Sequence, residues 1–238
     1  APWDSSAESQ GRLPAVLDYE WELYNVAEDF SEANNLAAKA PAKLKQLQEL
    51  FWKEAEKYHV LPIENGRITR FDVNLRPSLT RGRDEFTYFP GLIRIPEGAA
   101  PDTKNRTWQI TAEVIIPADG AEGILLTHGG RFSGWALYLL NGKPVFTYNL
   151  AGVTRYTVAG KEALTPGAHT IVYNFKYDGG LGKGGEASIQ LDGETVATGR
   201  IDRTLGFRLS LDETLDCGED TGTPVVEDYQ PRSTRFTG

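Results

Sequence analysis

The sequence WALYLLNGKPVFTYNL, residues 135–150, contains the feature that decides the fold. Two apolar runs of strand length flank the pair Asn141-Gly142. This pair tolerates the positive φ angles that a two-residue hairpin turn requires. The stretch therefore predicts two antiparallel strands joined by a tight turn.

Further strands are expected on both sides of this hairpin. Residues 109–117 and 169–177 alternate apolar and polar side chains, as a strand with one buried face does. A third alternation at 187–191 precedes Asp192-Gly193, a second hairpin signal. Short strands at roughly ten-residue spacing with Gly-rich turns are typical of a β-sandwich or jelly roll. Ten side chains are expected to point into its core: Ile110, Val114, Leu137, Leu139, Phe146, Ile171, Tyr173, Phe175, Ile189 and Leu191.

The first 65 residues have a different pattern. Residues 21–26, WELYNV, alternate large apolar and polar side chains and predict a short strand. Asp29 followed three positions later by Glu32 is a helix-start signature.

A clearer helix is expected from Pro41, a residue suited to a first helical position, to a point near His59. Its apolar positions recur at steps of three and four and share one face: Leu44, Leu47, Phe51, Ala55 and Tyr58. Helical periodicity stops near Asn65-Gly66. We therefore expect a strand-plus-helix segment at 1–65 and a β-sandwich domain at 66–238.

Composition narrows the possible partners. The chain has 238 residues and a formal net charge of −8, with no cluster of Lys or Arg, so a nucleic-acid partner is not expected. No apolar stretch has the length of a membrane span. A single cysteine excludes an internal disulfide and leaves a cytoplasmic or periplasmic location open. The chain lacks Met and begins at Ala1, so we expect a fragment or processed product.

Few residues suggest catalysis. His128 lies in Thr127-His128-Gly129-Gly130, which is interpreted as a loop. It is the one histidine that we consider for a functional role, and a structural histidine in a turn is the main interpretation. Cys217 has acidic neighbours that are expected to raise its thiol pKa, which predicts a small buried residue and a poor nucleophile. Lys176–Gly185 is rich in glycine but lacks the context of a phosphate loop, so a hairpin loop between strands is expected.

Two binding hypotheses remain open beside their structural alternatives. The acidic run at 212–220 contains oxygen ligands of the kind Ca²⁺ prefers, although its spacing does not match an EF-hand, and a solvated loop is the default. Four aromatic residues at strand positions are either core or a sugar-stacking platform: Trp135, Tyr138, Phe146 and Tyr148.

Several motifs resemble a known family. Residues 21–25, WELYN, followed by DFSEANNLA at 29–37, resemble the end of the catalytic domain in sulfatases. The helix from Pro41 and the VLP at 60–62 are similar to the C-terminal helix of bacterial-type arylsulfatases. GWALY at 134–138, YNFKYDGG at 173–180 and DTGTPV at 220–225 resemble a concanavalin-like β-sandwich appended to many of these enzymes. The resemblance covers nearly the whole chain.

The resemblance implies a role without catalysis. Sulfatases convert a Cys or Ser in a C/S-x-P-x-R motif to formylglycine, and no Cys or Ser here is followed by that pattern. The family's divalent metal, calcium, is held by residues that belong upstream. No catalytic, cofactor-binding or metal residue is therefore assigned in this chain, and none is expected to carry a cofactor.

Two hypotheses about function follow. In the first, the chain is the C-terminal, non-catalytic part of an arylsulfatase, a sulfuric ester hydrolase. Its partners are then the upstream catalytic domain and a sulfated small molecule or glycan. In the second, it is a free-standing lectin-like carbohydrate-binding module. Residues 1–65 favour the first, because a self-sufficient lectin does not need an amphipathic helix whose apolar face requires a partner.

Overall fold

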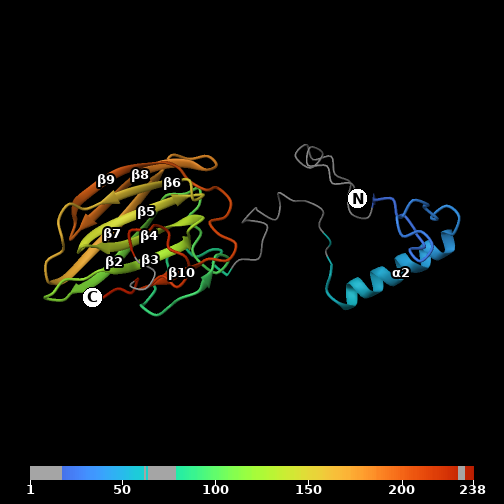
Figure 1. Cartoon of the computed structure of the whole chain (residues 1–238), viewed down its shortest axis with the longest axis horizontal. Coiled ribbons are helices and arrows are strands. Elements are labelled where there is room, and N and C mark those ends of the chain that lie inside the picture. The colour runs from blue at the N-terminus through green and yellow to red at the C-terminus, as the bar shows by residue number, and fades with distance from the viewer. Residues whose placement is uncertain (1–17, 62, 64–78, 230–233) are drawn as a thin grey trace. The chain divides into compact units, whose positions relative to one another are not determined.

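A computed structural model describes residues 18–61, 63, 79–229 and 234–238. The chain divides into two compact units, Ala1–Leu75 and Arg76–Gly238, and each is described by itself (Figure 1). The boundary expected between 65 and 66 lies outside the described residues and stays a prediction. Among the described residues, no helix is both long and apolar enough to cross a membrane.

The first unit contains helix α2 (Pro41–Lys57). Pro41 stands in its first turn and Lys57 in its last, where a cation interacts favourably with the carbonyl end of the helix. Chain direction changes directly after the helix, because His59 adopts a left-handed φ of 56°. The helix expected from Pro41 to about His59 is confirmed.

The segment before α2 corrects two expectations. Residues 21–26 form no strand. The Leu23 carbonyl accepts the Leu36 amide at 2.7 Å, and the Asn25 carbonyl accepts the amides of Glu28 and Asp29, which are turn contacts and not a strand ladder. Residues 29–32 form no helix. The Asp29 carboxylate accepts hydrogen bonds from the amides of Ala33 and Asn34, which closes a turn, and Glu32 has a φ of 54° that no α-helix accommodates.

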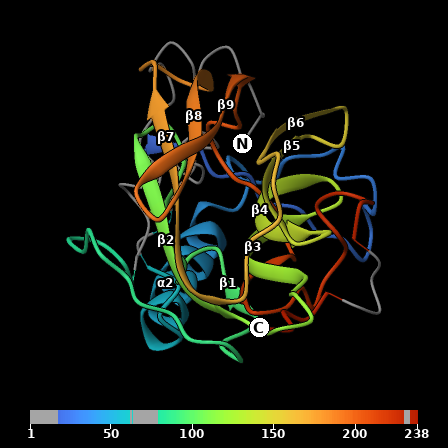
Figure 2. The same ribbon diagram turned by 90° about the vertical axis from the view of Figure 1, so that its left-hand side faces the viewer.

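The second unit is a sandwich of two antiparallel sheets, which Figure 2 shows facing each other. Sheet A has the order β1-β10-β3-β4-β5-β6, with bounds Ile95–Pro96, Thr214–Cys217, Gly123–Gly130, Ser133–Leu140, Lys143–Leu150 and Thr154–Ala159. Sheet B has the order β2-β7-β8-β9, with bounds Trp108–Ile116, Gly167–Tyr177, Lys183–Leu191 and Glu194–Arg203. The expected mainly β fold of sandwich type is confirmed.

The two hairpin turns set the register of their strands. Asn141 and Gly142 have φ angles of 51° and 71°, so Leu140 pairs with Lys143 across the turn between β4 and β5. A second turn at Asp192-Gly193 joins β8 to β9 in the same way, with φ angles of 51° and 90°. Both predicted hairpins are confirmed.

The core lies between the sheets and is rich in aromatic rings. Phe146 of sheet A stacks on Tyr173 of sheet B with ring centroids 3.6 Å apart, and Trp108 packs against both. Of the ten side chains expected to point inward, eight are buried in this core, and Ile110 and Leu191 are partly buried against it. Alternation therefore predicted the inner faces correctly.

The outer surface of sheet A is also covered. After β10 the chain returns across it, and residues 219–229 pack Val225, Val226 and Tyr229 against Ile124 and Tyr138. Sheet A is thus buried on both faces over β3, β4 and β5, which explains why these strands are apolar almost throughout.

Candidate functional site

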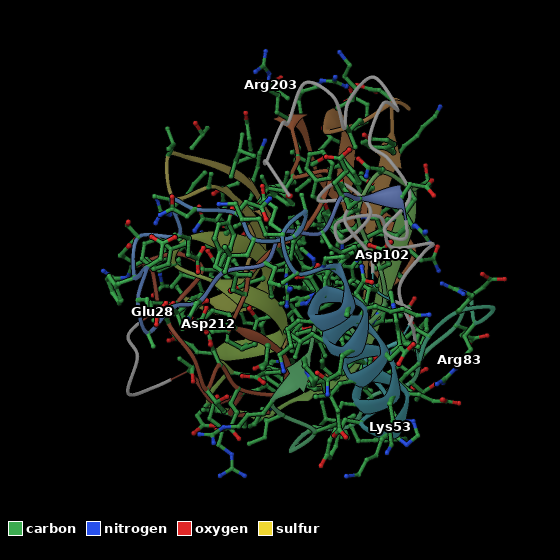
Figure 3. The ribbon with its side chains drawn as sticks, turned by 90° about the vertical axis from the view of Figure 1, so that its right-hand side faces the viewer. Glu28, Lys53, Arg83, Asp102, Arg203 and Asp212 are labelled. Atoms are coloured by element: carbon green, nitrogen blue, oxygen red, sulfur yellow. The ribbon has the colours of Figure 1, made fainter. Side chains whose placement is uncertain are left out.

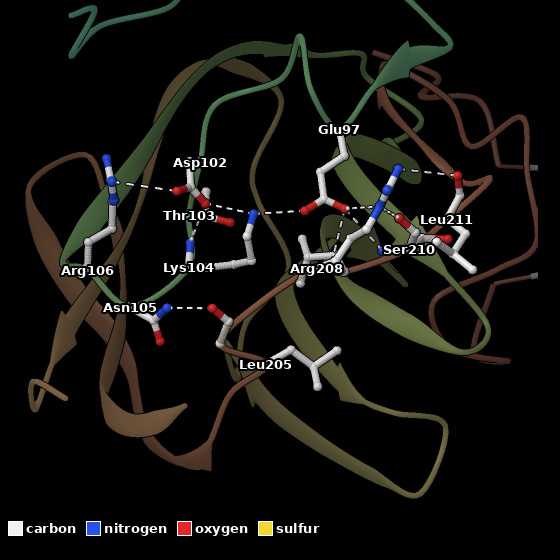
Figure 4. Close-up of polar contacts among 12 residues, drawn as sticks. Glu97, Asp102, Thr103, Lys104, Asn105, Arg106, Leu205, Arg208, Ser210 and Leu211 are labelled. Atoms are coloured by element: carbon white, nitrogen blue, oxygen red, sulfur yellow. Dashed lines mark hydrogen bonds and ion pairs between the residues drawn. The ribbon is translucent and has the colours of Figure 1, made fainter. Parts of the chain in front are cut away.

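An enclosed ionic network closes one end of the sandwich (Figure 4). The Glu97 side chain is only 5% exposed, and its Oε1 atom accepts a hydrogen bond from the Lys104 ammonium at 2.8 Å. Its Oε2 atom accepts the backbone amides of Leu209 and Ser210, at 3.1 and 3.2 Å. The guanidinium of Arg208 lies 3.6 Å from the same oxygen. Burial of this carboxylate is therefore matched by three hydrogen-bond donors and by the nearby charge of Arg208.

Lys104 extends the network to the adjacent loop. Its ammonium also lies 2.7 Å from Asp102. Burial raises the pKa of Asp102, but the charge and hydrogen bonds of Lys104 outweigh it, so the pKa lies below its ordinary value. Asn105 donates to the Gly206 carbonyl at 2.6 Å and accepts the Gly182 amide at 2.8 Å.

These contacts fasten the loop between β1 and β2 to the loop between β9 and β10. Each loop crosses from one sheet to the other, so the network holds the sheets together at this end. A catalytic site needs a nucleophile or base that substrate can reach, whereas Glu97 and Lys104 are enclosed and paired with each other. We assign the network a structural role. Sequence patterns missed it, because Glu97 and its partner Leu209 are 112 positions apart.

The segment over sheet A has its own polar anchors. The Tyr229 hydroxyl donates to Asp220 at 2.9 Å and accepts the Val225 amide at 2.9 Å. Asn149 donates to the Val225 carbonyl at 3.0 Å. Burial raises the pKa of Asp220 to about 6. The outer surface of sheet A is consequently closed by the chain itself and offers no open face for a ligand at this place.

The acidic run at 212–220 is not the solvated loop that was expected. Residues 214–217 form β10, and Asp216 is 1% exposed. One oxygen of Asp216 accepts the Arg94 amide at 2.5 Å, and the other accepts the amide and hydroxyl of Thr221. Glu213 accepts the hydroxyl of Thr223. Among the described residues no group of three or more His, Cys, Asp or Glu is placed to hold a metal ion.

His128 corrects another expectation. It lies inside strand β3, paired with Trp135 and Leu215, and is 1% exposed, so the loop interpretation was wrong. Glycines at 129 and 130 suggested a loop, but sheet pairing continues through both. Neither ring nitrogen has a hydrogen-bond partner among the described residues. Burial lowers the pKa of His128 to about 4, so the ring is neutral at pH 7 and enclosed from substrate.

The aromatic candidates lie inside the fold. Trp135, Phe146 and Tyr148 belong to the core between the sheets, and Tyr138 lies under the segment that covers sheet A. All four are at most 5% exposed. The core interpretation is confirmed, and the sugar-stacking alternative is wrong because no ring face reaches solvent.

The interpretations of Cys217 and of the glycine-rich stretch are confirmed, but the cause of the thiol pKa shift differs from the expected one. Cys217 is a buried residue of β10, as expected, but burial and not its acidic neighbours raises the pKa of its thiol. Residues 178–182 join β7 to β8, which confirms the hairpin loop in the glycine-rich stretch 176–185.

The first unit presents an apolar surface. Trp21 packs edge-on against Phe51 and Trp52, with ring centroids 5.4 and 6.3 Å apart. Two of these rings are exposed, Trp21 at 36% and Phe51 at 38%, and Leu50 of the same helix is 51% exposed. Ala55 is the one buried residue of α2. We call Trp21, Leu47, Leu50 and Phe51 the aromatic face of the first unit.

Comparison with known proteins identifies no family. No family model matches the chain, and no curated protein matches it. Among solved structures, the chain is similar to the mouse laminin alpha1 chain, domains LG4-5, with 19% sequence identity and a TM-score of 0.40. That match covers 59% of this chain and 33% of the laminin chain. A likeness at this level indicates no ligand for this chain.

Proposed function

We propose that this chain is the C-terminal, non-catalytic part of an arylsulfatase-type sulfuric ester hydrolase. Residues 18–61 complete an upstream catalytic domain, and the sandwich is an accessory domain. The uncovered aromatic face of the first unit is the observation that supports the proposal best. Contiguous exposed apolar surface on a protein is typical of an interaction site.

The low stability expected for α2 alone supports a partner that packs against it. An isolated helix the length of α2 is marginal in water, because nucleation is costly and most helical stability comes from packing. Within the described residues α2 buries only Ala55. A protein surface that covers Leu47, Leu50 and Phe51 therefore supplies the stabilisation that the helix lacks.

The segment before α2 supports the same assignment. Its sequence resembles the end of a sulfatase catalytic domain. Two of its residues organise the loop: Asp29 accepts the amides of Ala33 and Asn34, and Asn35 accepts those of Leu23 and Ala37. The polar residues of the motif therefore shape the backbone. The large apolar side chain that they flank, Phe30, is 94% exposed and free to contact a partner.

The proposal places the chemistry outside this chain. No C/S-x-P-x-R motif occurs in the sequence, so the formylglycine, the calcium and the contacts to a sulfated substrate belong to the upstream domain. The reading frame directly upstream is expected to encode that motif. A frame without it, or with an unrelated domain, overturns the proposal.

Docking is testable with matched variants. The upstream domain and this chain are expressed separately and are expected to form a one-to-one complex. Phe51→Lys is expected to weaken it at least tenfold, since central aromatic residues dominate such interfaces. Lys53 is exposed on α2 (Figure 3), and Lys53→Ala is the control that leaves affinity unchanged. Equal effects of both variants contradict docking through the aromatic face.

A lectin-like module is the alternative that the same material tests. The purified chain is screened on arrays of sulfated and unsulfated glycans and assayed with an aryl sulfate chromogen and divalent metal. We expect no turnover above a heat-killed control. Saturable glycan binding by the chain alone, together with failure to bind the upstream domain, favours the lectin-like function.

A further inference from the structure

A groove runs along the outer edge of sheet B. Residues 84–90, which lie outside both sheets, form one wall, and strand β2 forms the other through residues 109–114. Its volume is about 900 Å³, within the range of binding sites. The floor is apolar and comes from Leu125, Leu126, Trp135, Leu215 and Cys217.

The β2 wall is an unpaired strand edge. β2 is outermost in sheet B and pairs with β7 alone. The amide and carbonyl of Thr170 both bond to Asp192, on the β8 side of β7. Backbone N–H and C=O groups point to alternate sides along a strand. Those of the next residue, Ile171, therefore point away from β8 and toward its partner Ala112 of β2.

The backbone groups that face the groove follow from this register. If Ala112 bonds to β7, its neighbours Thr111 and Glu113 point their amides and carbonyls away from β7. Among the described residues no backbone group outside sheet B bonds to them. Gly238 marks where the open edge ends, because a Cβ built on it would lie 2.5 Å from the Ile115 carbonyl oxygen.

Charge and side-chain direction define what fits. The lining contains the carboxylates of Asp84, Glu85 and Glu113 and no Lys, Arg or His. Ile110, Ala112 and Val114 alternate with polar residues and point toward the core, so the groove is apolar inside. The titratable lining residues are thus mainly acidic, and the Arg83 guanidinium packs over the Phe86 ring beside them.

We propose that this groove binds an extended peptide strand of a partner protein, which adds to sheet B next to β2. The strand runs antiparallel, as every other pair in sheet B does. It places apolar side chains on the floor and Lys or Arg side chains opposite Thr111 and Glu113. A six-residue wall spans about 20 Å, which accommodates a strand of about six or seven residues.

Peptides with defined N-methylation test the pairing directly. A fluorescein-labelled heptapeptide that alternates lysine and valine is titrated into the full chain and followed by anisotropy. Paired residues share a face, so the lysine amides donate to β2 and the valine amides point away from it. N-methylation of one central lysine amide is expected to weaken binding about tenfold, and that of a central valine amide much less. Equal losses, or no binding of the parent peptide, overturn the proposal.

Two protein variants locate the site. Thr111→Pro removes an amide that faces the groove and leaves the bonds to β7 in place, and it is expected to weaken binding about tenfold relative to Thr111→Ala. Appending the heptapeptide sequence after Gly238 is expected to block the free peptide, because the added strand starts at the end of the groove. Undiminished binding to the extended chain places the peptide elsewhere and overturns the proposal. If the chain forms a dimer that the peptide does not dissociate, a second copy of the chain is the occupant of the groove. That result also overturns the proposal.

Discussion

Lys104→Met tests whether the enclosed ionic network fastens the two sheets. The Lys104 side chain is 4% exposed and lies 2.8 Å from Glu97 and 2.7 Å from Asp102. Methionine has a similar length and fills the same space, so the change removes a charge and leaves little cavity. Asp102 is 22% exposed and can be hydrated, whereas Glu97 is 5% exposed and cannot.

The structure sets the size of the effect. Removing one partner of a buried ion pair costs about 3–5 kcal/mol, because the other charge stays buried without its counterpart. Glu97 keeps two backbone amides and the Arg208 guanidinium 3.6 Å away, which argues for the lower end, about 3 kcal/mol. For a domain of this size that loss lowers the melting temperature by roughly 6–12 °C.

Thermal and urea unfolding of the full chain measure the effect, and Arg106→Met is the matched control. Arg106 contacts the same Asp102 at 3.6 Å but is 56% exposed, so its loss is expected to cost less than about 1 kcal/mol. Adding Glu97→Gln to Lys104→Met is expected to restore part of the stability, since no charge is then stranded. Equal effects of the two single variants, or no recovery in the double variant, refute the reasoning.

Three further predictions concern stability and its pH dependence. Burial raises the pKa of Asp220 from 3.8 to about 6, so the folded state holds the proton more tightly than the unfolded state. The free energy of unfolding of the wild type therefore falls as pH rises between these values. Asp220→Asn is expected to remove that slope in urea titrations from pH 4 to 7. Burial lowers the pKa of His128 from 6.5 to about 4, so stability falls as pH drops between these values. His128→Leu is expected to remove this opposite slope. It is also expected to stabilise the fold by roughly 1–3 kcal/mol at pH 7, because it removes two buried ring nitrogens that have no hydrogen-bond partner among the described residues. An unchanged slope in either variant contradicts the burial argument. Gly142→Ala places a side chain at a φ of 71° and 3.1 Å from the Ala163 Cβ atom, so a loss of about 1 kcal/mol in stability is expected. Lys161 is exposed, and Lys161→Ala is the control that is expected to lose none.

Local patterns predicted the sandwich because its hairpins are local. Asn141-Gly142 and Asp192-Gly193 fix strand pairs within a few residues, and alternation then assigns the inner faces. The same patterns failed at residues 21–26, where alternation is present but no neighbouring strand is available among the described residues. A strand is stabilised by its partners, so alternation alone does not predict one.

The candidate sites were harder to predict, since they depend on contacts between distant segments. His128 lies opposite Leu215, and Asp216 opposite Thr127, only because β10 pairs with β3. Glycines after His128 suggested a loop, and acidic residues around Asp216 suggested a solvated one. Glycines and acidic residues are indeed common in loops. Burial by distant segments overrode them, as tertiary structure commonly overrides local preference.

The two sites proposed above, the aromatic face and the groove beside β2, both call for a polypeptide partner. Sheet A is covered on its inner face by the core and on its outer face by residues 219–229. The charged groups enclosed at the end of the sandwich, Glu97 and Lys104, are matched by protein donors and acceptors. The aromatic face beside α2 is exposed, and β2 is outermost in sheet B. An apolar helix face requires a packed surface and a strand edge requires a backbone, and proteins supply both.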